Sequence, residues 1–237
     1  MESTSAADAG ARSVISVWKV SLARRELDVA WSDLDDTERQ RAARYAFGRD
    51  RRRFVLARSA LRRILGQRLR ITPAKLTFEL GTAGKPFLRE HRDLGFNVSH
   101  SADVALIAVA NQPAAIGVDI ERRHNLQNAG ELAGDICSRE QADAIAASSN
   151  ASLAFLRVWT RKEAASKALG FGVGSIDLRA FDAGLDGESL SVLSGAHVAV
   201  MPLQVGHDHV ASIAQVATQV PVIEMADASN ALWPHSI

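Results

Sequence analysis

The stretch Ala114-Ala115-Ile116-Gly117-Val118-Asp119-Ile120-Glu121 decides the fold of this chain. Its apolar run predicts a buried strand from Ile116 to Glu121. Because side chains alternate along a strand, Asp119 and Glu121 face the same side. We therefore expect two carboxylates to project from one face of this strand.

A second motif lies on a predicted helix further along the chain. The run Trp159-Thr160-Arg161-Lys162-Glu163-Ala164-Ala165-Ser166-Lys167 places Glu163 and Lys167 four residues apart, so the two share one helix face. A third carboxylate and a lysine are thus expected to meet the first two carboxylates across a cleft. Such a set suits a divalent metal ion that holds a phosphorylated substrate.

The pattern upstream of these motifs predicts a mixed helix and strand unit. Apolar residues at helical spacing predict a long amphipathic helix from Asp50 to Leu69. Thr37-Glu38-Arg39-Gln40 predicts a capping box that opens a shorter helix before it. Strands are expected at 14–20, 75–80, 96–100 and 104–110, the last two as a hairpin.

The pattern downstream predicts a second unit of the same kind. Ser138 and Asn150 are expected to cap two helices, which end near Ala147 and Leu169. Strands are expected at 176–182, 188–193, 197–203 and 209–217. The turn at 111–113 divides the chain into an N-terminal half, 1–113, and a C-terminal half, 114–237, and the tail after 217 has no predicted role. The class is α+β, with a cleft where the halves meet.

Charge and composition narrow the function classes. The formal net charge is only +1, but residues 39–70 hold twelve arginines and one acid, Asp50. This stretch favours an anionic partner, with a solvated helix face as the alternative. The only cysteine, Cys137, excludes an intrachain disulfide and a cysteine-based metal site. No signal-peptide core and no membrane-length apolar run are present, so the cytoplasm is the expected location.

Each candidate motif also has a plainer interpretation. Asp119 and Glu121 match exposed acids on an edge strand, and Ser99 and His100 match a hairpin end capped by serines. Lys85 with the rigid Pro86 is suited to hold an anion on a turn, or is simply a turn before a strand. An exposed Glu163–Lys167 pair would contribute only about 0.3–0.5 kcal/mol to a surface helix.

The combination is far more specific than its parts. Gly84-Lys85-Pro86, Phe96-Asn97-Val98-Ser99-His100-Ser101, the Asp119–Glu121 motif and the helix motif ending at Gly170 occur in that order. This sequence resembles the 4'-phosphopantetheinyl transferase family, in particular the type that activates surfactin synthetase. Arg44-Tyr45, Asp50 and Arg53, with the long helix, extend the resemblance to residues 37–174.

The resemblance implies an activity, a fold and a set of site residues. Members move the phosphopantetheine arm of coenzyme A onto a serine of an apo carrier protein and release adenosine 3',5'-bisphosphate. Their fold is two similar α/β halves with pseudo-twofold symmetry and the active site between them. By resemblance, Asp119, Glu121 and Glu163 would bind Mg²⁺, and Glu163 and Lys167 would be catalytic, with Glu163 as metal ligand, base or both. The residues implied in coenzyme A binding are Lys85, Pro86, Ser99 and His100, and more weakly Arg44, Arg53 and Lys162.

Partners follow from the same resemblance, and two other functions compete with it. The carrier protein is expected to be acidic and the enzyme to be a monomer, with no membrane and no nucleic acid as partner. The first competitor is a nucleic-acid-binding protein that uses the Arg39–Arg70 helix, although aromatic residues are few and no known motif is present. The second is a Mg²⁺-dependent nucleotide hydrolase, for which no glycine-rich phosphate loop is found.

Overall fold

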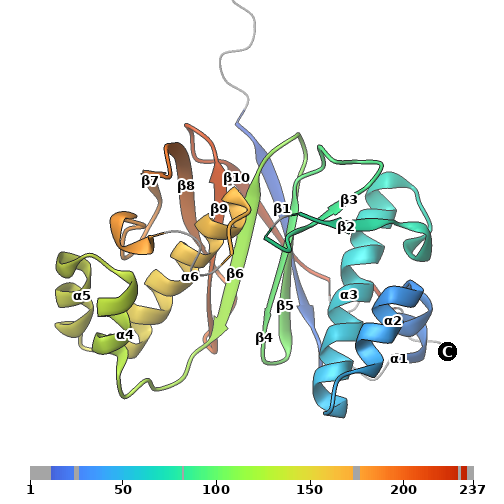
Figure 1. The fold of residues 1–237 in the computed structure, drawn as a ribbon, viewed down its shortest axis with the longest axis horizontal. Helices are drawn as coiled ribbons and strands as arrows, with labels where there is room; N and C mark the ends of the chain where they lie inside the picture. The colour runs from blue at the N-terminus through green and yellow to red at the C-terminus, as the bar shows by residue number, and fades with distance from the viewer. Residues whose placement is uncertain (1–11, 24–26, 82, 173–176, 229–230, 234–237) are drawn as a thin grey trace, which may run out of the picture.

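The chain folds into four layers, with two β-sheets packed face to face and helices covering each outer face (Figure 1). This computed structural model describes residues 12–23, 27–81, 83–172, 177–228 and 231–233. Between the sheets lies an apolar core that joins Val17 and Leu106 of one sheet to Val118 and Ile213 of the other. No helix among the described residues combines the length and the apolar character needed to cross a membrane.

The first sheet carries the N-terminal half of the chain. Its strand order is β10-β1-β5-β4, with β1 (Val14–Ser21), β4 (Phe96–Ser101), β5 (Val104–Ala110) and β10 (Val222–Asp227). Helices α1 (Leu27–Ser32), α2 (Asp36–Ala43) and α3 (Gly48–Leu69) cover its outer face. A 3-10 turn, η1 (Pro73–Lys75), leads into a small hairpin of β2 (Phe78–Leu80) and β3 (Pro86–Leu88).

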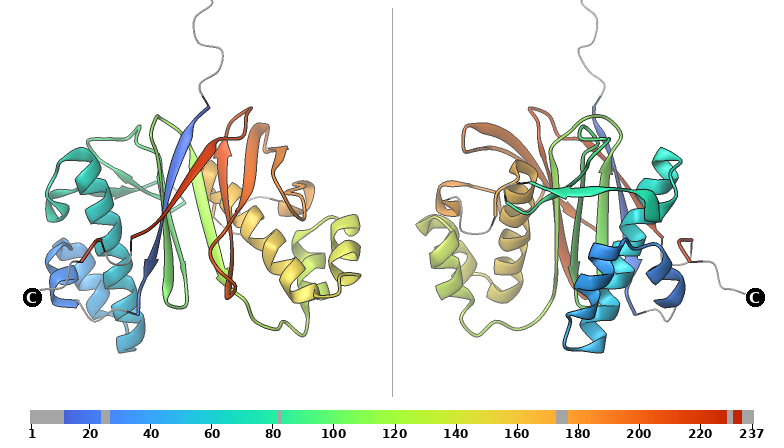
Figure 2. Two further views of the ribbon diagram at one scale, coloured as in Figure 1. Left: turned by 180° about the vertical axis from the view of Figure 1, so that it is seen from behind. Right: turned by 45° about the vertical axis from the view of Figure 1, so that its right-hand side comes forward.

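The second sheet carries most of the C-terminal half. Its strand order is β6-β9-β8-β7, with β6 (Ile116–Arg122), β7 (Ser189–Leu193), β8 (Ala196–Leu203) and β9 (His209–Val216). Helices α4 (Ala129–Ile136), α5 (Arg139–Ala146) and α6 (Ala151–Leu169) lie outside it (Figure 2). A 3-10 turn, η2 (Leu178–Ala180), precedes β7.

The two halves repeat one topology, which confirms the predicted fold class. In each half a first strand is followed by helices and then by an antiparallel run of strands. The last strand of that run returns to pair with the first, as β5 pairs with β1 and β9 pairs with β6. Long helices α3 and α6 occupy equivalent places over their sheets.

Local sequence signals place the ends of α6 as predicted. The Asn150 side chain accepts a hydrogen bond from the Leu153 amide at 2.9 Å, and Gly170 ends the helix in the left-handed conformation with φ 74°. The capping box predicted before α3 is placed two residues too late in the sequence. Asp35, not Thr37, caps α2, and Glu38 completes the box while it also binds Arg58 and Arg62 of α3.

Three further expectations need correction. Residues 177–182 contain the short η2 turn (Leu178–Ala180) within irregular backbone instead of a strand, and residue 176 lies outside the described residues. The strand predicted at 75–80 begins only at Phe78, because the 3-10 turn that starts at Pro73 includes Lys75. Helix α4 was not predicted; it is only eight residues long, and Asn128 at its N-cap makes no side-chain capping hydrogen bond.

The tail returns to the N-terminal half, although no role was predicted for it. Strand β10 pairs in parallel with β1, from Val14 opposite Val222 to Lys19 opposite Asp227. Trp233 is 1% exposed and packs in the core beneath α3. Strand β10 therefore belongs to the sheet of the N-terminal half, although its residues lie within the predicted C-terminal half, 114–237. The division at residue 113 stays a prediction.

We expect Trp233→Phe to lower the free energy of unfolding by about 1–2 kcal/mol, because the variant leaves a buried hydroxyl without one of its partners. The indole Nε1 donates to Ser59 Oγ at 3.1 Å, and both groups are buried. Urea unfolding at equilibrium measures this. A change below about 0.3 kcal/mol would show that the tail only covers the core and is not anchored to α3.

Candidate active site

Strand β4 meets strand β6 through side chains, and this seam positions the candidate site. Asn97 and Ser101 point from one face of β4 toward the open edge of β6. Asn97 Oδ1 accepts from the Val118 amide at 2.9 Å, and Ser101 Oγ accepts from the Arg122 amide at 3.0 Å. These side chains satisfy backbone donors that a neighbouring strand would otherwise satisfy. The seam thus joins the two sheets and fixes their register.

The same row of polar side chains orients both carboxylates of β6. Ser99 Oγ donates to Asp119 Oδ1, and Ser101 Oγ donates to Glu121 Oε2, each at 2.9 Å. Asp119 is 4% exposed. The strand alternation predicted from sequence is therefore confirmed, and the serines hold the two carboxylates on the side that faces α6.

Gly117 allows α6 to lie unusually close to β6. A Cβ atom at this position would be 2.1 Å from Ala164 O and 2.4 Å from Ala168 N. The close contact brings Lys167 Nζ to 2.6 Å from Asp119 Oδ1 and 3.7 Å from Glu163 Oε2. Lys167 thus contacts Asp119 across the seam and also Glu163, the residue with which helical spacing predicts that it shares a face.

The seam carries more negative than positive charge. Burial raises the pKa of Glu163; Lys167 opposes this shift, and the Asp119 charge adds to it. Burial likewise raises the pKa of Glu121, with Ser101 opposing and Asp119 adding to the shift. Three carboxylates face a single ammonium here, so the site favours a further cation.

The residues at the seam fit a divalent metal ion. Asp119 Oδ2 and Glu163 Oε1 are buried and accept no hydrogen bond from any described residue. Carboxylate oxygens without a partner are the ligands that Mg²⁺ prefers. No group of three such side chains in the described residues is already arranged around a metal position, and the Lys167 ammonium lies against Asp119 and Glu163 instead.

Lys85 and Pro86 lie where the hairpin of β2 and β3 meets the second half. Lys85 Nζ donates to Ile116 O and to Lys167 O, each at 2.8 Å, and burial lowers its pKa to about 8. The ammonium therefore ties the hairpin to β6 and to the end of α6. Among the described residues nothing accepts its third N–H, which is therefore available to a ligand.

A groove runs from the seam along α3. Two cavities, of about 400 and 370 Å³, share Tyr45, Phe54 and His100 in their walls. Pro86 lines the first, and Arg53, which donates to Asp103 at 2.9 Å, lines the second. Partial burial lowers the pKa of His100, and the Arg53 and Lys167 charges lower it further. Aromatic walls with cations at the rim suit a nucleotide.

Two predicted coenzyme A contacts do not join this groove. Lys162 is 0% exposed, and its ammonium donates to Leu178 O and Phe181 O on another flank of α6, so assigning it to coenzyme A was wrong. Consecutive helix residues lie about 100° apart, which separates Lys162 from Glu163. Arg44 ends α2 and is exposed, outside both cavities.

The sequence did not predict that Asn97 and Ser101 join β4 to β6, or that Gly117 lets α6 lie close to β6. The signal for the first two was present: Asn97, Ser99 and Ser101 alternate along one predicted strand, which puts all three on one face. Gly117 gave no signal of its own, since the need for a glycine there comes from α6.

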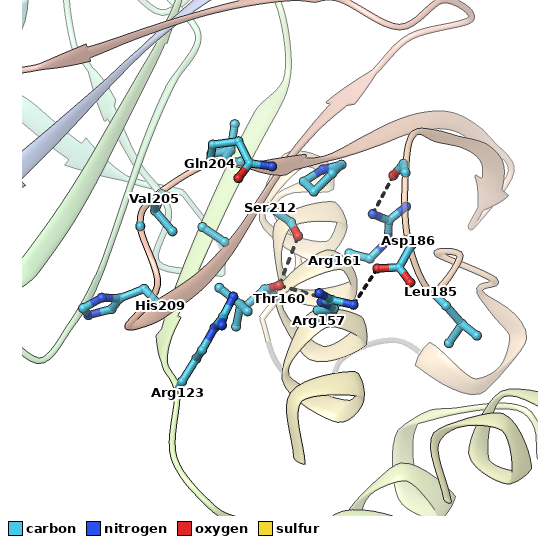
Figure 3. A pocket seen from close by; sticks show the side chains of 16 residues that line it. Arg123, Arg157, Thr160, Arg161, Leu185, Asp186, Gln204, Val205, His209 and Ser212 are labelled. Atoms are coloured by element: carbon cyan, nitrogen blue, oxygen red, sulfur yellow. Dashed lines mark hydrogen bonds and ion pairs between the residues drawn. The ribbon is translucent and has the colours of Figure 1, made fainter. Parts of the chain in front are cut away.

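A separate cavity of about 280 Å³ lies between α6 and the loop that joins β8 to β9 (Figure 3). Thr160 and Ser212 line it, with their hydroxyl oxygens 3.0 Å apart. Neither the three carboxylates nor the serines of the seam line this cavity, whereas Ser101 of the seam lines the groove. We therefore place the candidate site at the seam.

Comparison with known proteins finds family matches in both halves of the chain. Residues 16–112 match the family model of the 4'-phosphopantetheinyl transferase N-terminal domain, and residues 115–213 match that of the 4'-phosphopantetheinyl transferase superfamily.

Three curated relatives carry related names. The 4'-phosphopantetheinyl transferase HetI of Nostoc sp. is 32% identical over 170 residues, which cover 69% of this chain and 71% of the relative. The 4'-phosphopantetheinyl transferase Sfp of Bacillus subtilis is 27% identical over 180 residues, 74% of this chain and 78% of Sfp. The 4'-phosphopantetheinyl transferase gsp of Aneurinibacillus migulanus is 31% identical over 151 residues, 60% of this chain and 58% of that protein.

Proposed function

Because the chain belongs to the 4'-phosphopantetheinyl transferase superfamily, we propose that it transfers the phosphopantetheine arm of coenzyme A to a serine of an apo carrier protein. We propose further that it is of the surfactin-synthetase-activating type, since one chain supplies both halves of the site. The observation that carries the proposal is the seam, where Asp119, Glu121 and Glu163 converge beside Lys167.

The seam would hold the magnesium ion and the diphosphate. Asp119, Glu121 and Glu163 supply the oxygen ligands, and two of these residues have a buried oxygen without a partner. When bound, Mg²⁺ neutralises charge that develops on the departing phosphate. Lys167 binds a diphosphate oxygen, while Ser99, His100 and the free N–H of Lys85 bind the other phosphate groups.

Glu163 is the residue best suited to take the proton of the carrier serine. Its carboxylate is buried beside Lys167 at the seam, within the cluster proposed to hold the diphosphate, and a positioned carboxylate accepts a proton in general base catalysis. The serine oxygen forms a bond to the pantetheine phosphorus, and the bond from that phosphorus to adenosine 3',5'-bisphosphate breaks. The serine proton goes to the carboxylate.

The test is a change in carrier mass. An apo carrier protein incubated with the enzyme, coenzyme A and Mg²⁺ is expected to gain about 340 Da, the mass of the phosphopantetheine arm. Intact-protein mass spectrometry over fatty-acid, polyketide and peptide-assembly carriers measures the gain. Unchanged masses for every carrier type would contradict the proposal.

The competing nucleic-acid function loses support from the placement of the arginines. Arg62 and Arg63 of the basic stretch lie against α1 and α2, where they bind the carboxylates Asp33, Asp35 and Glu38. Only part of the predicted basic face is therefore free for a polyanion. Steeply salt-dependent binding to duplex or single-stranded nucleic acid would restore that function.

The exposed arginines fit an acidic carrier protein. Arg49 and Arg51 lie at the exposed start of α3, on either side in sequence of Asp50, which lines the groove. We expect Arg49→Glu with Arg51→Glu to raise the KM for the carrier about tenfold at low salt, because charge reversal repels an acidic partner. The KM for coenzyme A should change less than about twofold. Steady-state kinetics at two salt concentrations measure both constants, and equal losses for the two substrates would show that the carrier binds elsewhere.

Ligand binding should also stabilise the protein. We expect coenzyme A and Mg²⁺, each at about 100 times its Kd, to raise Tm by about 10–20 °C together, with about half of the increment from each. In Asp119→Asn the increment due to Mg²⁺ should disappear, while that of coenzyme A alone remains. Differential scanning fluorimetry with and without a chelator measures both increments. An unchanged Mg²⁺ increment in this variant would remove Asp119 from the metal site.

We further propose that the enzyme acts as a monomer in the cytoplasm, where coenzyme A is available. A duplicated fold that supplies both sides of one groove does not need a second subunit to complete the site.

A further inference from the structure

Two buried cations precede Glu163 directly in the sequence. Arg161 is 2% exposed and Lys162 is 0% exposed. Desolvation lowers the pKa of both groups, so their burial costs free energy. The groove does not include them, and the proposed reaction leaves them without a role.

Lys162 holds the start of the segment that follows α6. Its ammonium donates to Leu178 O at 2.8 Å and to Phe181 O, and it lies 5.7 Å from the centre of the Phe181 ring. Phe181 is itself fully buried against α6 and the second sheet. The lysine thus supplies donors to two main-chain carbonyls that irregular backbone would otherwise leave unsatisfied.

Arg161 holds the end of the same segment (Figure 3). Its guanidinium donates through Nε to Ala183 O at 2.6 Å, through Nη1 to Gly187 O at 2.8 Å and through Nη2 to Ser189 Oγ at 3.0 Å. The planar fork therefore joins three points of the chain at once, which a lysine ammonium on a flexible stem does less well. Together Arg161 and Lys162 hold residues 178–189 against α6.

Helix α6 lies between this segment and strand β6. On one flank, Gly117 and Asp119 of β6 contact the helix closely. On the other flank, Arg161 and Lys162 bind the 178–189 segment. Rotation of α6 about its axis would break contacts on both flanks, and it would also move Glu163 and Lys167 away from Asp119.

We propose that Arg161 and Lys162 are positioning residues that fix the rotation of α6, so that Glu163 and Lys167 face the carboxylates of β6. This inference rests on the proposed function for its catalytic consequence. Misplacing a reacting group by about 1 Å can cost up to about 100-fold in rate. Arg161 and Lys162 would therefore influence turnover without contacting the substrate.

The first experiment measures how strongly the amides of α6 are protected from hydrogen exchange. We expect Lys162→Met and Arg161→Met to speed amide hydrogen exchange of residues 163–169 at least about tenfold, at a temperature where each variant stays folded. Lys75→Met and Arg139→Met are matched controls, because both residues are exposed. Arg161→Lys, which keeps the charge but not the fork, should fall between wild type and Arg161→Met. Exchange at the wild-type rate in folded Lys162→Met would overturn the proposal.

The second experiment tests the link to Glu163. We expect kcat for the carrier to fall about 10- to 100-fold in Lys162→Met, with a smaller change in the KM for coenzyme A. In a Glu163→Gln background the same substitution should cost clearly less than in wild type, because one of the two groups that it positions is already removed. An equal loss in both backgrounds would show that Lys162 does not act through Glu163. If wild type modifies no carrier, the proposed function fails, while the exchange rates still decide whether the two residues hold α6.

Discussion

Glu163→Gln is expected to lower the rate of phosphopantetheine transfer by about 10³-fold, the largest loss we expect from any single conservative change. Glutamine keeps the size of the side chain but cannot accept the proton of the carrier serine. It also removes a charge from the cluster that Asp119 and Glu121 form beside it. The rate should therefore fall through the loss of the base and through weaker metal binding together.

Rapid-quench mass spectrometry of the carrier measures this loss. The variant should stay folded, and stability should even rise slightly in the absence of metal, since a buried carboxylate near two others is removed. Glu131→Gln is the matched control, because Glu131 is exposed on α4. Turnover within about tenfold of wild type would leave Glu163 without a catalytic role.

Gly117→Ala is expected to have the second largest effect, with a fall in rate of at least about 100-fold. The added methyl group would lie 2.1 Å from Ala164 O, and backbone cannot yield as a flexible side chain does. Helix α6 must move away from β6 and take Glu163 and Lys167 with it. We also expect a loss of about 1–3 kcal/mol in the free energy of unfolding, as in other overpacked cores.

The control for this change is another glycine. Gly134→Ala places a methyl group with no atom within 4 Å, in the interior of α4, where alanine is favoured over glycine. It should leave the rate unchanged and stabilise the protein slightly. If Gly117→Ala binds coenzyme A and turns over like wild type, then the close contact of α6 with β6 is not needed for the site.

The sequence predicted those parts of the site that depend on local geometry. Alternation along β6 places Asp119 and Glu121 on one face, and spacing along α6 places Glu163 and Lys167 together. Both statements concern residues a few positions apart. Nothing but the duplicated layout suggested that the two pairs would meet, and the contact itself depends on Gly117.

The failures concern contacts between residues that are distant in sequence. Lys162 looked like a ligand contact because it lies in a motif of charged residues, yet its acceptors are carbonyls of the 178–189 segment. Arg62 looked like part of a basic surface, but Asp35 and Glu38 pair with it from another helix. Charge in a sequence does not reveal whether its partner is solvent, a ligand or the protein itself.

The parallel pairing of β1 with β10 affects how the chain matures during synthesis. Strand β1 is synthesised about 200 residues before its partner β10, so the first sheet lacks an edge strand and the Trp233 anchor until residues 222–233 have been made. Nascent domains usually form in order from the N-terminus. Here the four strands of the second sheet are all synthesised before β10, which completes the first sheet. A nascent chain stalled before residue 222 should therefore expose the edge of β1 to chaperones.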